Sequence, residues 1–265
     1  WGFFVLQPES RIVARSPALT KLAQQFAKDL RLLTGLEPTV ITSASEPVRD
    51  HDIVLAVTTG ASPNNLEGYT LKIGYSVDLR SRSYVGVVFG TRTMLQMLAQ
   101  AKTLGSASAP SSQAVSSKTL YKNSLPQGQT VDYPDYKERG LMLDVGRMFF
   151  TKEYLKDYIR FLSYYKMNVF HLHLNDNKPN ASSLKDYAAF RLKSDNPKFK
   201  NLAAKDGSYT KADWNELEEV AALYGVTILP EIDSPAHALA FTRFRPEIRL
   251  KHYPDQFDLS HPAAL

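Results

Sequence analysis

The sequence predicts an α/β protein built in two parts, and three observations lead to this prediction. Short apolar segments of strand length alternate with amphipathic segments of helix length along most of the 265 residues. A small, polar stretch, GSASAPSSQAVSS over 105–117, interrupts this alternation. Polar side chains follow each predicted strand of the second part, where parallel α/β folds gather their chemistry. We expect a small α/β domain over 1–104, a Ser-rich loop and linker over 105–133, and a second domain over 134–265.

The amino-acid composition excludes several classes of protein. Apolar residues make up 43% and charged residues 22%, which is typical of a globular protein and not of a disordered or fibrous one. The net charge is +5, but Lys and Arg are scattered among Asp and Glu, so we expect no nucleic-acid partner. No apolar run approaches the roughly 18 residues of a membrane span. The chain has no cysteine, which excludes disulfides, thiolate catalysis and Cys-ligated zinc. Without a basic segment followed by a long apolar one at its start, a signal peptide is expected to be absent or already removed.

The first part mixes strands and helices. Ser16 and Pro17 open a helix with an N-cap and a first-turn proline, and Gly35 ends it. A second helix is expected over 91–101, after the apolar run 84–89. Short apolar, β-branched segments predict strands over 3–6, 11–14, 39–41, 53–57, 69–73 and 77–79. Only Gly74 to Ser76 separate the last two strands, so they form a hairpin and the sheet is not wholly parallel.

The second part has a regular β-α-β-α-β rhythm. Thr151 caps its first helix, and Thr210 with Asp213 forms a capping box at the start of the second, which Gly225 ends. The predicted strands span 141–145, 168–174 and 226–229, and a long irregular stretch is expected between the second strand and Ser208. Apolar strands in this order predict a parallel sheet covered by helices.

Arg147 follows the first of these strands, and Asp144 lies within its end. The forked donors of an arginine in this position can hold two vicinal hydroxyls or a carboxylate. An Arg–Asp pair that only fixes the loop explains the same pattern, so the position alone leaves both interpretations open.

His171 and His173 lie on one face of the second strand, and Asp176 follows the strand end. The group predicts a metal site, a layer of histidines inside a barrel, or core histidines satisfied by their neighbours. A His-x-His pair is a weak metal signal by itself, because zinc sites need a third and often a fourth ligand.

Glu231 and Asp233 end the third strand, and His237 follows them. Two carboxylates and a histidine are energetically costly there unless they are paired or used, so catalysis, sugar binding and a buried ion network are all open. Asn180 begins the one N-glycosylation sequon that we note, Asn180-Ala181-Ser182.

Three blocks carry a family resemblance: RGLMLDVGRMFF from Arg139, YKMNVFHLHLND from Tyr165 and GVTILPEIDSPAH from Gly225. Together they resemble glycoside hydrolase family 20, the β-N-acetylhexosaminidases, whose pattern has LDVxR, YKxNxxHxHLxD and GxxxxPEIDxPGH in this order. The first part, with its GYTLKI and GVVFGTRTMLQML segments, is similar to the small domain that precedes the barrel in that family. The resemblance therefore covers nearly the whole chain.

The resemblance implies a (β/α)₈ barrel whose first three strands are those predicted above. It also implies removal of terminal β-linked N-acetylhexosamine by substrate-assisted, retaining hydrolysis, as in chitin degradation, with no metal and no cofactor. Asp176 and His237 are the implied catalytic residues, a polar network behind the acid. Arg147, which would hold sugar hydroxyls, and Glu231, in the polar layer with His173, are the implied substrate-binding residues.

The departures from the family pattern concern the loop beside the pocket and the acid. Asp176-Asn177-Lys178 stands where the family often has DDQ, and Pro235-Ala236-His237 replaces PGH. The Asp–Glu pair of the family's HxGxDE segment does not follow His237. We therefore expect a portion of a longer enzyme, with the C-terminal half of the same barrel as its partner.

Further expectations concern partners and alternatives. A glycan is the expected substrate, a homodimer is open, and the expected location is extracellular or a secretory or lysosome-like compartment. A non-catalytic glycan-binding homologue and a metal-dependent α/β-barrel hydrolase using His171 and His173 are the alternatives.

Overall fold

The computed structural model describes residues 2–106 and 123–264, and the chain divides into two compact units. Unit 1 comprises Trp1–Lys137, Ser163–Lys166 and Leu223–Gly225, and unit 2 comprises Glu138–Leu162, Met167–Ala222 and Val226–Leu265. Within the described residues, no helix has the length and apolar character that crossing a membrane requires. Both units combine strands with helices, so the predicted α/β class is confirmed.

Unit 1 is built on a six-stranded mixed sheet in the order β3-β2-β4-β6-β5-β8. Its strands are β2 (Arg11–Ala14), β3 (Thr39–Thr42), β4 (Ile53–Val57), β5 (Tyr69–Ile73), β6 (Val77–Ser81) and β8 (Gly128–Asp132). The pairs from β3 to β6 are parallel, whereas β5 pairs antiparallel with β6 and with β8. The predicted hairpin is confirmed, because Gly74 donates its N–H to Ser76 O at 2.9 Å between β5 and β6.

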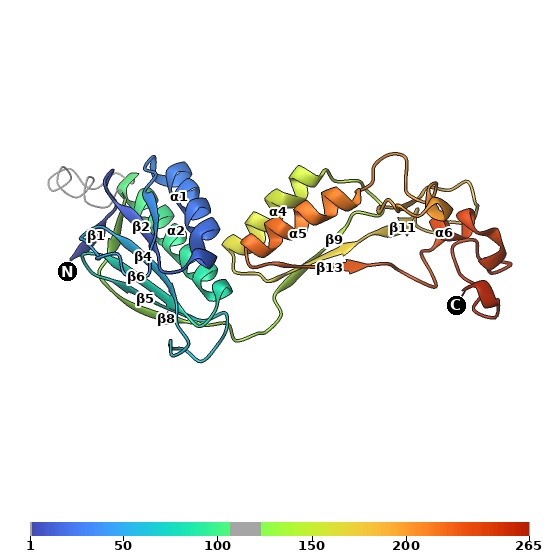
Figure 1. Ribbon diagram of the computed structural model, residues 1–265. Coiled ribbons are helices and arrows are strands. Elements are labelled where there is room, and N and C mark those ends of the chain that lie inside the picture. Colours follow the sequence, from blue (N-terminus) through green and yellow to red (C-terminus); the bar gives the residue numbers. More distant parts are fainter. Residues whose placement is uncertain (1, 107–122, 265) are drawn as a thin grey trace. The chain divides into compact units, whose positions relative to one another are not determined.

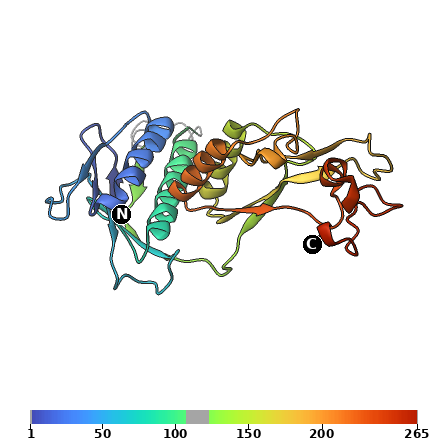
Figure 2. The ribbon, with the colours of Figure 1, turned by 45° about the vertical axis from the view of Figure 1, so that its right-hand side comes forward.

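Helices α1 (Thr20–Thr34) and α2 (Tyr84–Ser106) lie side by side on one face of this sheet (Figures 1 and 2). A short 3-10 turn, η1 (Pro17–Leu19), precedes α1, and Gly35 ends α1 in the left-handed conformation at φ +82°. The apolar stripe of α1 is buried in the core, as its spacing predicts: Leu22, Ala23, Phe26 and Leu30.

The prediction for α2 is wrong at its start, because the helix begins at Tyr84 and not near Thr91. Val87, Val88 and Phe89 are all fully buried, so this first part of the helix is covered on more than one side. A continuous apolar run of this kind shows no 3.6-residue period, and periodicity alone does not separate a buried helix from a strand.

The expected linker over 105–133 is also wrong in its second half. β7 (Ser124–Pro126) pairs antiparallel with β1 (Phe3–Val5), and β8 is an edge strand of the main sheet. Leu125 is fully buried, so this pairing extends the core of unit 1. Polar edge strands carry little apolar pattern, which explains the error. Residues 107–122 of the predicted linker lie outside the described residues.

Unit 2 contains a three-stranded parallel sheet in the order β13-β10-β9. Its strands are β9 (Gly140–Asp144), β10 (Val169–His173) and β13 (Thr227–Glu231). Helices α4 (Lys152–Tyr164) and α5 (Lys211–Leu223) connect them and lie next to each other beside the sheet (Figures 1 and 2). Sequential parallel strands joined by helices are the arrangement with which a (β/α)₈ barrel begins.

Both predicted helix caps of unit 2 are present. Thr151 Oγ1 accepts the N–H of Tyr154 at 3.2 Å at the start of α4. At the start of α5, Thr210 Oγ1 accepts the N–H of Asp213 at 3.1 Å, and Asp213 Oδ2 accepts the N–H of Thr210 at 2.9 Å. This reciprocal pair is a capping box, and it fixes where the helix leaves the long loop before it.

The stretch from Asn175 to Ser208 is more ordered than expected. β11 (Asn175–Asn177) pairs antiparallel with β12 (Ala188–Phe190), and a 3-10 turn, η2 (Pro197–Phe199), follows. The chain after β13 forms α6 (Leu239–Phe244), η3 (Pro246–Ile248) and η4 (Pro262–Ala264). Only Leu174 separates β11 from the end of β10, so the polar residues of β11 lie close to the carboxyl edge of the parallel sheet.

Candidate active site

Polar residues from three strands meet at the carboxyl edge of the parallel sheet of unit 2. The register pairs His173 of β10 with Asp144 of β9 and with Glu231 of β13, so these three residues lie at one level. Asp176 and His237 come from the segments that follow β10 and β13. The structure thus brings together all the site residues that the sequence predicts, through the alternation of α and β elements.

Asp176 is the centre of this cluster. Its Oδ2 lies 2.8 Å from Nη2 of Arg147 and 2.7 Å from Nε2 of His173, and its Oδ1 lies 2.8 Å from Nδ1 of His237. The N–H of Asn177 also donates to Oδ1, at 2.7 Å. The residue is only 2% exposed, so a carboxylate there needs these donors to replace water.

Arg147 is held by oxygen atoms of three residues. Its Nη1 donates to Asp144 Oδ2 at 2.8 Å, its Nη2 reaches Asp176, and its Nε donates to the carbonyl of Asn177 at 3.2 Å. A guanidinium carries five N–H donors, so one on Nη1 and one on Nη2 remain for a ligand. The side chain is 40% exposed. The loop-fixing Arg–Asp pair therefore exists, and it leaves donors free for substrate.

His171 and His173 share one carboxylate oxygen. Oε2 of Glu231 lies 2.7 Å from Nε2 of His171 and 2.9 Å from Nδ1 of His173. Burial alone would lower the pKa of His173, but hydrogen bonds to Glu231 and Asp176 outweigh it and raise that pKa. A carboxylate oxygen faces each ring nitrogen, so this environment favours the protonated form of His173, which can donate on both sides.

Two overlapping groups in this cluster have ligand atoms within 4.8 Å of one another: Asp144, His173 and Asp176, and His173, Glu231 and Asp233. His173 belongs to both groups. A cation would have to replace one of the carboxylate hydrogen bonds of His173 and bind its neutral ring, and the geometry that raises the pKa of His173 opposes this.

Arg191 is a residue that the sequence reasoning missed. Its guanidinium is fully buried and donates to the carbonyls of Val145 and Gly146 at 2.6 and 3.0 Å, next to Arg147. Nη1 also donates to Asp206 at 2.8 Å, so Arg191 ties the loop after β9 to the long segment after β12. A single arginine gives no signal of burial by itself, and the sequence signal that could have indicated this position is the apolar residues on both sides of it, Ala188 to Phe190 and Leu192.

Gly146 is a second residue that the sequence reasoning missed. A Cβ atom on Gly146 would lie 2.7 Å from both Asn175 C and Asp176 N, a distance that real Cβ atoms essentially never show. The loop after β9 therefore passes directly against the backbone after β10. This close approach brings Arg147 within reach of Asp176.

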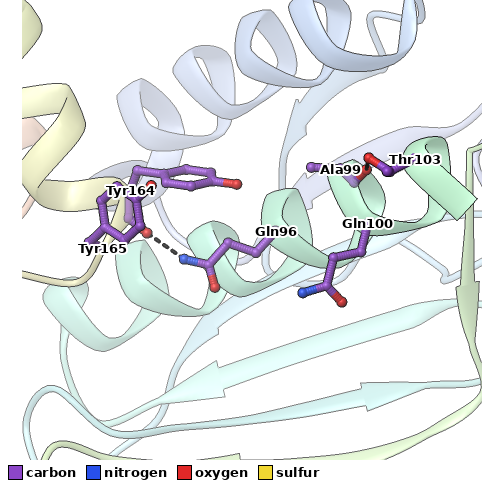
Figure 3. A pocket seen from close by; sticks show the side chains of 6 residues that line it. All are labelled: Gln96, Ala99, Gln100, Thr103, Tyr164 and Tyr165. Carbon is purple, nitrogen blue, oxygen red and sulfur yellow. Dashed lines mark hydrogen bonds between the residues drawn. The ribbon is translucent and has the colours of Figure 1, made fainter.

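Two hollows lie away from this cluster. In unit 1, a cavity of about 630 Å³ is lined by residues of α2 and by the tyrosine pair Tyr164 and Tyr165, and Gln96 donates to the carbonyl of Tyr164 there (Figure 3). In unit 2, a cavity of about 670 Å³ lies between α6 and the segment from Asn201 to Asp206. Neither is lined by a predicted site residue, so the carboxyl edge of the parallel sheet remains the candidate site.

Comparisons with known proteins agree with this architecture. Residues 136–262 match the model of the glycosyl hydrolase family 20 catalytic domain, and residues 1–133 match domain 2 of the same family. A beta-hexosaminidase of Akkermansia muciniphila is 31% identical over 246 residues, with 90% of this chain and 41% of that protein covered. One of Vibrio furnissii is 30% identical over 257 residues, with 93% and 37% covered.

A solved structure of a mutant Streptomyces plicatus beta-hexosaminidase in complex with its product GlcNAc has a TM-score of 0.74 at 27% identity. That comparison covers 97% of this chain and 48% of the other. The chain thus spans less than half the length of these relatives. Two family models in succession account for nearly all of its residues, and the chain belongs to glycosyl hydrolase family 20.

Proposed function

We propose that the full-length protein is a glycoside hydrolase that removes terminal β-linked N-acetylhexosamine from glycans or chitooligosaccharides. The placement of Arg147 carries this proposal: Asp144 and Asp176 hold it at the carboxyl edge of the sheet, with two N–H donors free. Paired donors of a fixed guanidinium suit two neighbouring sugar hydroxyls. The names of the relatives and the GlcNAc in the solved structure support the choice of sugar.

Glu231 is the proposed second contact to the sugar. Both histidines bind its Oε2, and among the described residues no hydrogen bond to its Oε1 is found. The Glu231 side chain is 34% exposed, so its second oxygen can accept a hydrogen bond from a hydroxyl. Arg147 would donate hydrogen bonds to the ligand and Glu231 would accept them. This combination favours a ligand with several hydroxyl groups.

The proposed mechanism is substrate-assisted. The carbonyl oxygen of the 2-acetamido group attacks the anomeric carbon of its own sugar while the glycosidic bond breaks and a carboxylic acid protonates the leaving oxygen. Water then opens the oxazolinium intermediate with retention of configuration, the exception to the two-carboxylate scheme that some families follow. In the family pattern the acid and the residue that orients the acetamido group are an Asp–Glu pair. That pair is not among the residues printed here.

Asp176 and His237 are the proposed catalytic pair behind the reacting sugar. Asp176 is buried and His237 is partly exposed, so the histidine can face the reacting groups while the carboxylate fixes its ring. His173 compensates the charge of Asp176 from the other side, at 2.7 Å. In this arrangement the pair stabilises charge that develops during the reaction, and Arg147 binds the ground state.

The C-terminal half of the same barrel is the proposed partner of the three-stranded sheet. Met142 and Leu229 flank His171 in register on one face of the sheet, and they are 54% and 46% exposed. β9 and β13 each pair with only one strand among the described residues. Further parallel strands at these edges would cover both apolar side chains and close the barrel.

We also propose that the protein acts outside the cytoplasm, in a secretory or lysosome-like compartment. Asn180, which begins the sequon, is exposed in unit 2 and so is accessible to a glycosyltransferase. A shift in the mass of the native protein after treatment with a peptide N-glycosidase supports this location, provided that Asn180→Gln removes the shift.

Hydrolysis assays with the full-length gene product test the proposed activity. The substrates are the p-nitrophenyl β-glycosides of GlcNAc, GalNAc and glucose. We expect turnover of one or both acetamido sugars, release of the β-anomer as first product by NMR, and no turnover of the glucoside, which lacks the acetamido nucleophile. Turnover of the glucoside at a comparable rate would contradict the mechanism. Binding of GlcNAc without any turnover would favour the glycan-binding alternative.

A further inference from the structure

Asn175 is the first residue of β11, the strand labelled in Figure 1. It is fully buried, and nothing in the family resemblance gives it a role. Its side chain makes three hydrogen bonds, and all of them reach the segment after β13. Oδ1 accepts the N–H of Asp233 at 2.8 Å, and Nδ2 donates to the carbonyls of Asp233 and His237 at 3.1 and 3.2 Å. A backbone N–H can only donate and a carbonyl can only accept, so these partners fix the orientation of the amide.

The segment that Asn175 holds carries the candidate catalytic histidine. Asp233 and His237 bracket four peptide bonds, and Asn175 contacts the first residue and the last. His237 has a left-handed backbone with φ +54°, a conformation that costs energy in a residue other than glycine. A hydrogen bond from Nδ2 to the carbonyl of His237 therefore restrains the residue at the point where its backbone is strained.

Asn175 also directly precedes Asp176, which lies 2.8 Å from His237 Nδ1. One strand thus supplies both the clamp on the backbone of His237 and the carboxylate that binds its imidazole. Because the two side chains are neighbours on β11, backbone and ring of His237 are positioned against the same rigid element.

We infer that Asn175 is a positioning residue: it holds the Asp233–His237 loop so that the imidazole of His237 stays on Asp176. The expected effect on kcat rests on the proposed function. The expected effect on the position of the loop rests on the hydrogen bonds alone. Removing the amide takes away an anchor at each end of the loop, while Phe257 N–H still donates to the carbonyl of Pro235. A displacement of a catalytic group by about 1 Å can lower the reaction rate by about 10²-fold.

Asn168 offers a matched control, because it is an asparagine just before β10, at the opposite end of the sheet. Its Oδ1 accepts the N–H of Arg139 at 2.8 Å, so it too ties one strand to the segment beside another. Asn168→Ala removes a comparable clamp far from the carboxyl edge. A general loss of stability affects both variants, whereas displacement of His237 affects only Asn175→Ala.

The structural test is single-amide hydrogen exchange on the full-length protein. Asn175→Ala should speed exchange at Asp233 by at least about tenfold and leave Arg139 unchanged, since a lost hydrogen bond exposes that amide to local opening. Asn168→Ala should do the reverse. Equal exchange at Asp233 in the wild type and Asn175→Ala would overturn the inference. This measurement does not depend on activity. It therefore shows whether Asn175 holds the Asp233–His237 loop even if the wild type turns over no hexosaminide and the proposed function fails.

The kinetic test is a double-mutant cycle with His237. Asn175→Ala should lower kcat by about 10²-fold with little change in KM, and Asn168→Ala should leave kcat unchanged. In a His237→Ala background, Asn175→Ala should cause no further loss, because the residue acts through that histidine. An equal loss in both backgrounds would overturn the inference, as would full kcat in Asn175→Ala. If Asn175→Ala does not fold, Asn175→Asp, which keeps the acceptor for Asp233 and loses the amide donors, enters the same cycle with the same outcomes.

Discussion

Nη2 of Arg147 lies 2.8 Å from Oδ2 of Asp176, so an ion pair joins residues that follow two different strands. Asp144 holds the other terminal nitrogen at 2.8 Å. These two carboxylates fix the guanidinium plane, which lowers the ordering cost of binding the proposed sugar ligand. The geometry predicts which substitutions disturb the site and which do not.

Replacing Arg147 tests its role in binding. In the full-length protein, Arg147→Ala should raise KM and lower kcat/KM by about 10²- to 10⁴-fold, because two hydrogen bonds that involve a charged group contribute about 1.5–3 kcal/mol each. Arg147→Lys should recover little, since an ammonium cannot reproduce the fork between Asp144 and Asp176. Steady-state kinetics measures both effects. Arg245→Ala, which removes an exposed ion pair with Glu247, is the control and should have wild-type kinetics. Unchanged kinetics in a folded Arg147→Ala protein would rule out the assigned role.

His173 predicts a pH dependence of stability. Its folded-state pKa is raised, and an unfolded histidine has a pKa near 6.5. The stabilisation is therefore fully present below about pH 6.5 and is lost as pH rises through the higher folded-state value. Compared with His173→Gln, the wild type should lose thermal stability as pH rises above about 6.5. His252→Gln, at an exposed site, is the control. Parallel curves for the wild type and His173→Gln would show that His173 is not charged in the folded protein.

Metal removal should not affect the proposed activity. His173 already faces a carboxylate on each ring nitrogen, and it is common to both groups that could hold a cation. Treatment with a chelator should leave kcat/KM of the full-length protein unchanged, and elemental analysis should find no stoichiometric zinc. Activity that is lost on chelation and restored by zinc would instead favour the metal-dependent hydrolase.

Much of this fold could be predicted from the sequence, where each element has a local signal. The capping box of Thr210 and Asp213 and the left-handed Gly35 are consequences of short-range chemistry. The start of α2 at Tyr84 and the edge strand Gly128–Asp132 could not be found in this way. Both depend on which surface covers them, and that is a property of the tertiary structure.

The candidate site also contains residues that could be predicted from the sequence and residues that could not. Asp144, His173 and Glu231 could be placed together, because strand ends of a parallel sheet share one edge. Arg191 and Asn175 could not, because their function is to bind backbone atoms of loops that are distant in sequence. A side chain that recognises carbonyls leaves no pattern in its own segment.

Gly146 provides the most direct test of the packing beneath the site. A Cβ atom at this position would lie 2.7 Å from the backbone of Asn175 and Asp176, and backbone cannot move aside as a flexible side chain can. Gly146→Ala should therefore push the loop after β9 away from β11, destabilise the protein by about 1–3 kcal/mol and separate Arg147 from Asp176. Because Arg147 then binds the sugar less well, KM should rise in the same variant. Gly128→Ala is the control, since nothing lies within 4 Å of a Cβ built there. Thermal unfolding and steady-state kinetics of both variants give the comparison, and a Gly146→Ala protein with the stability and KM of Gly128→Ala would show that this close approach does not position Arg147.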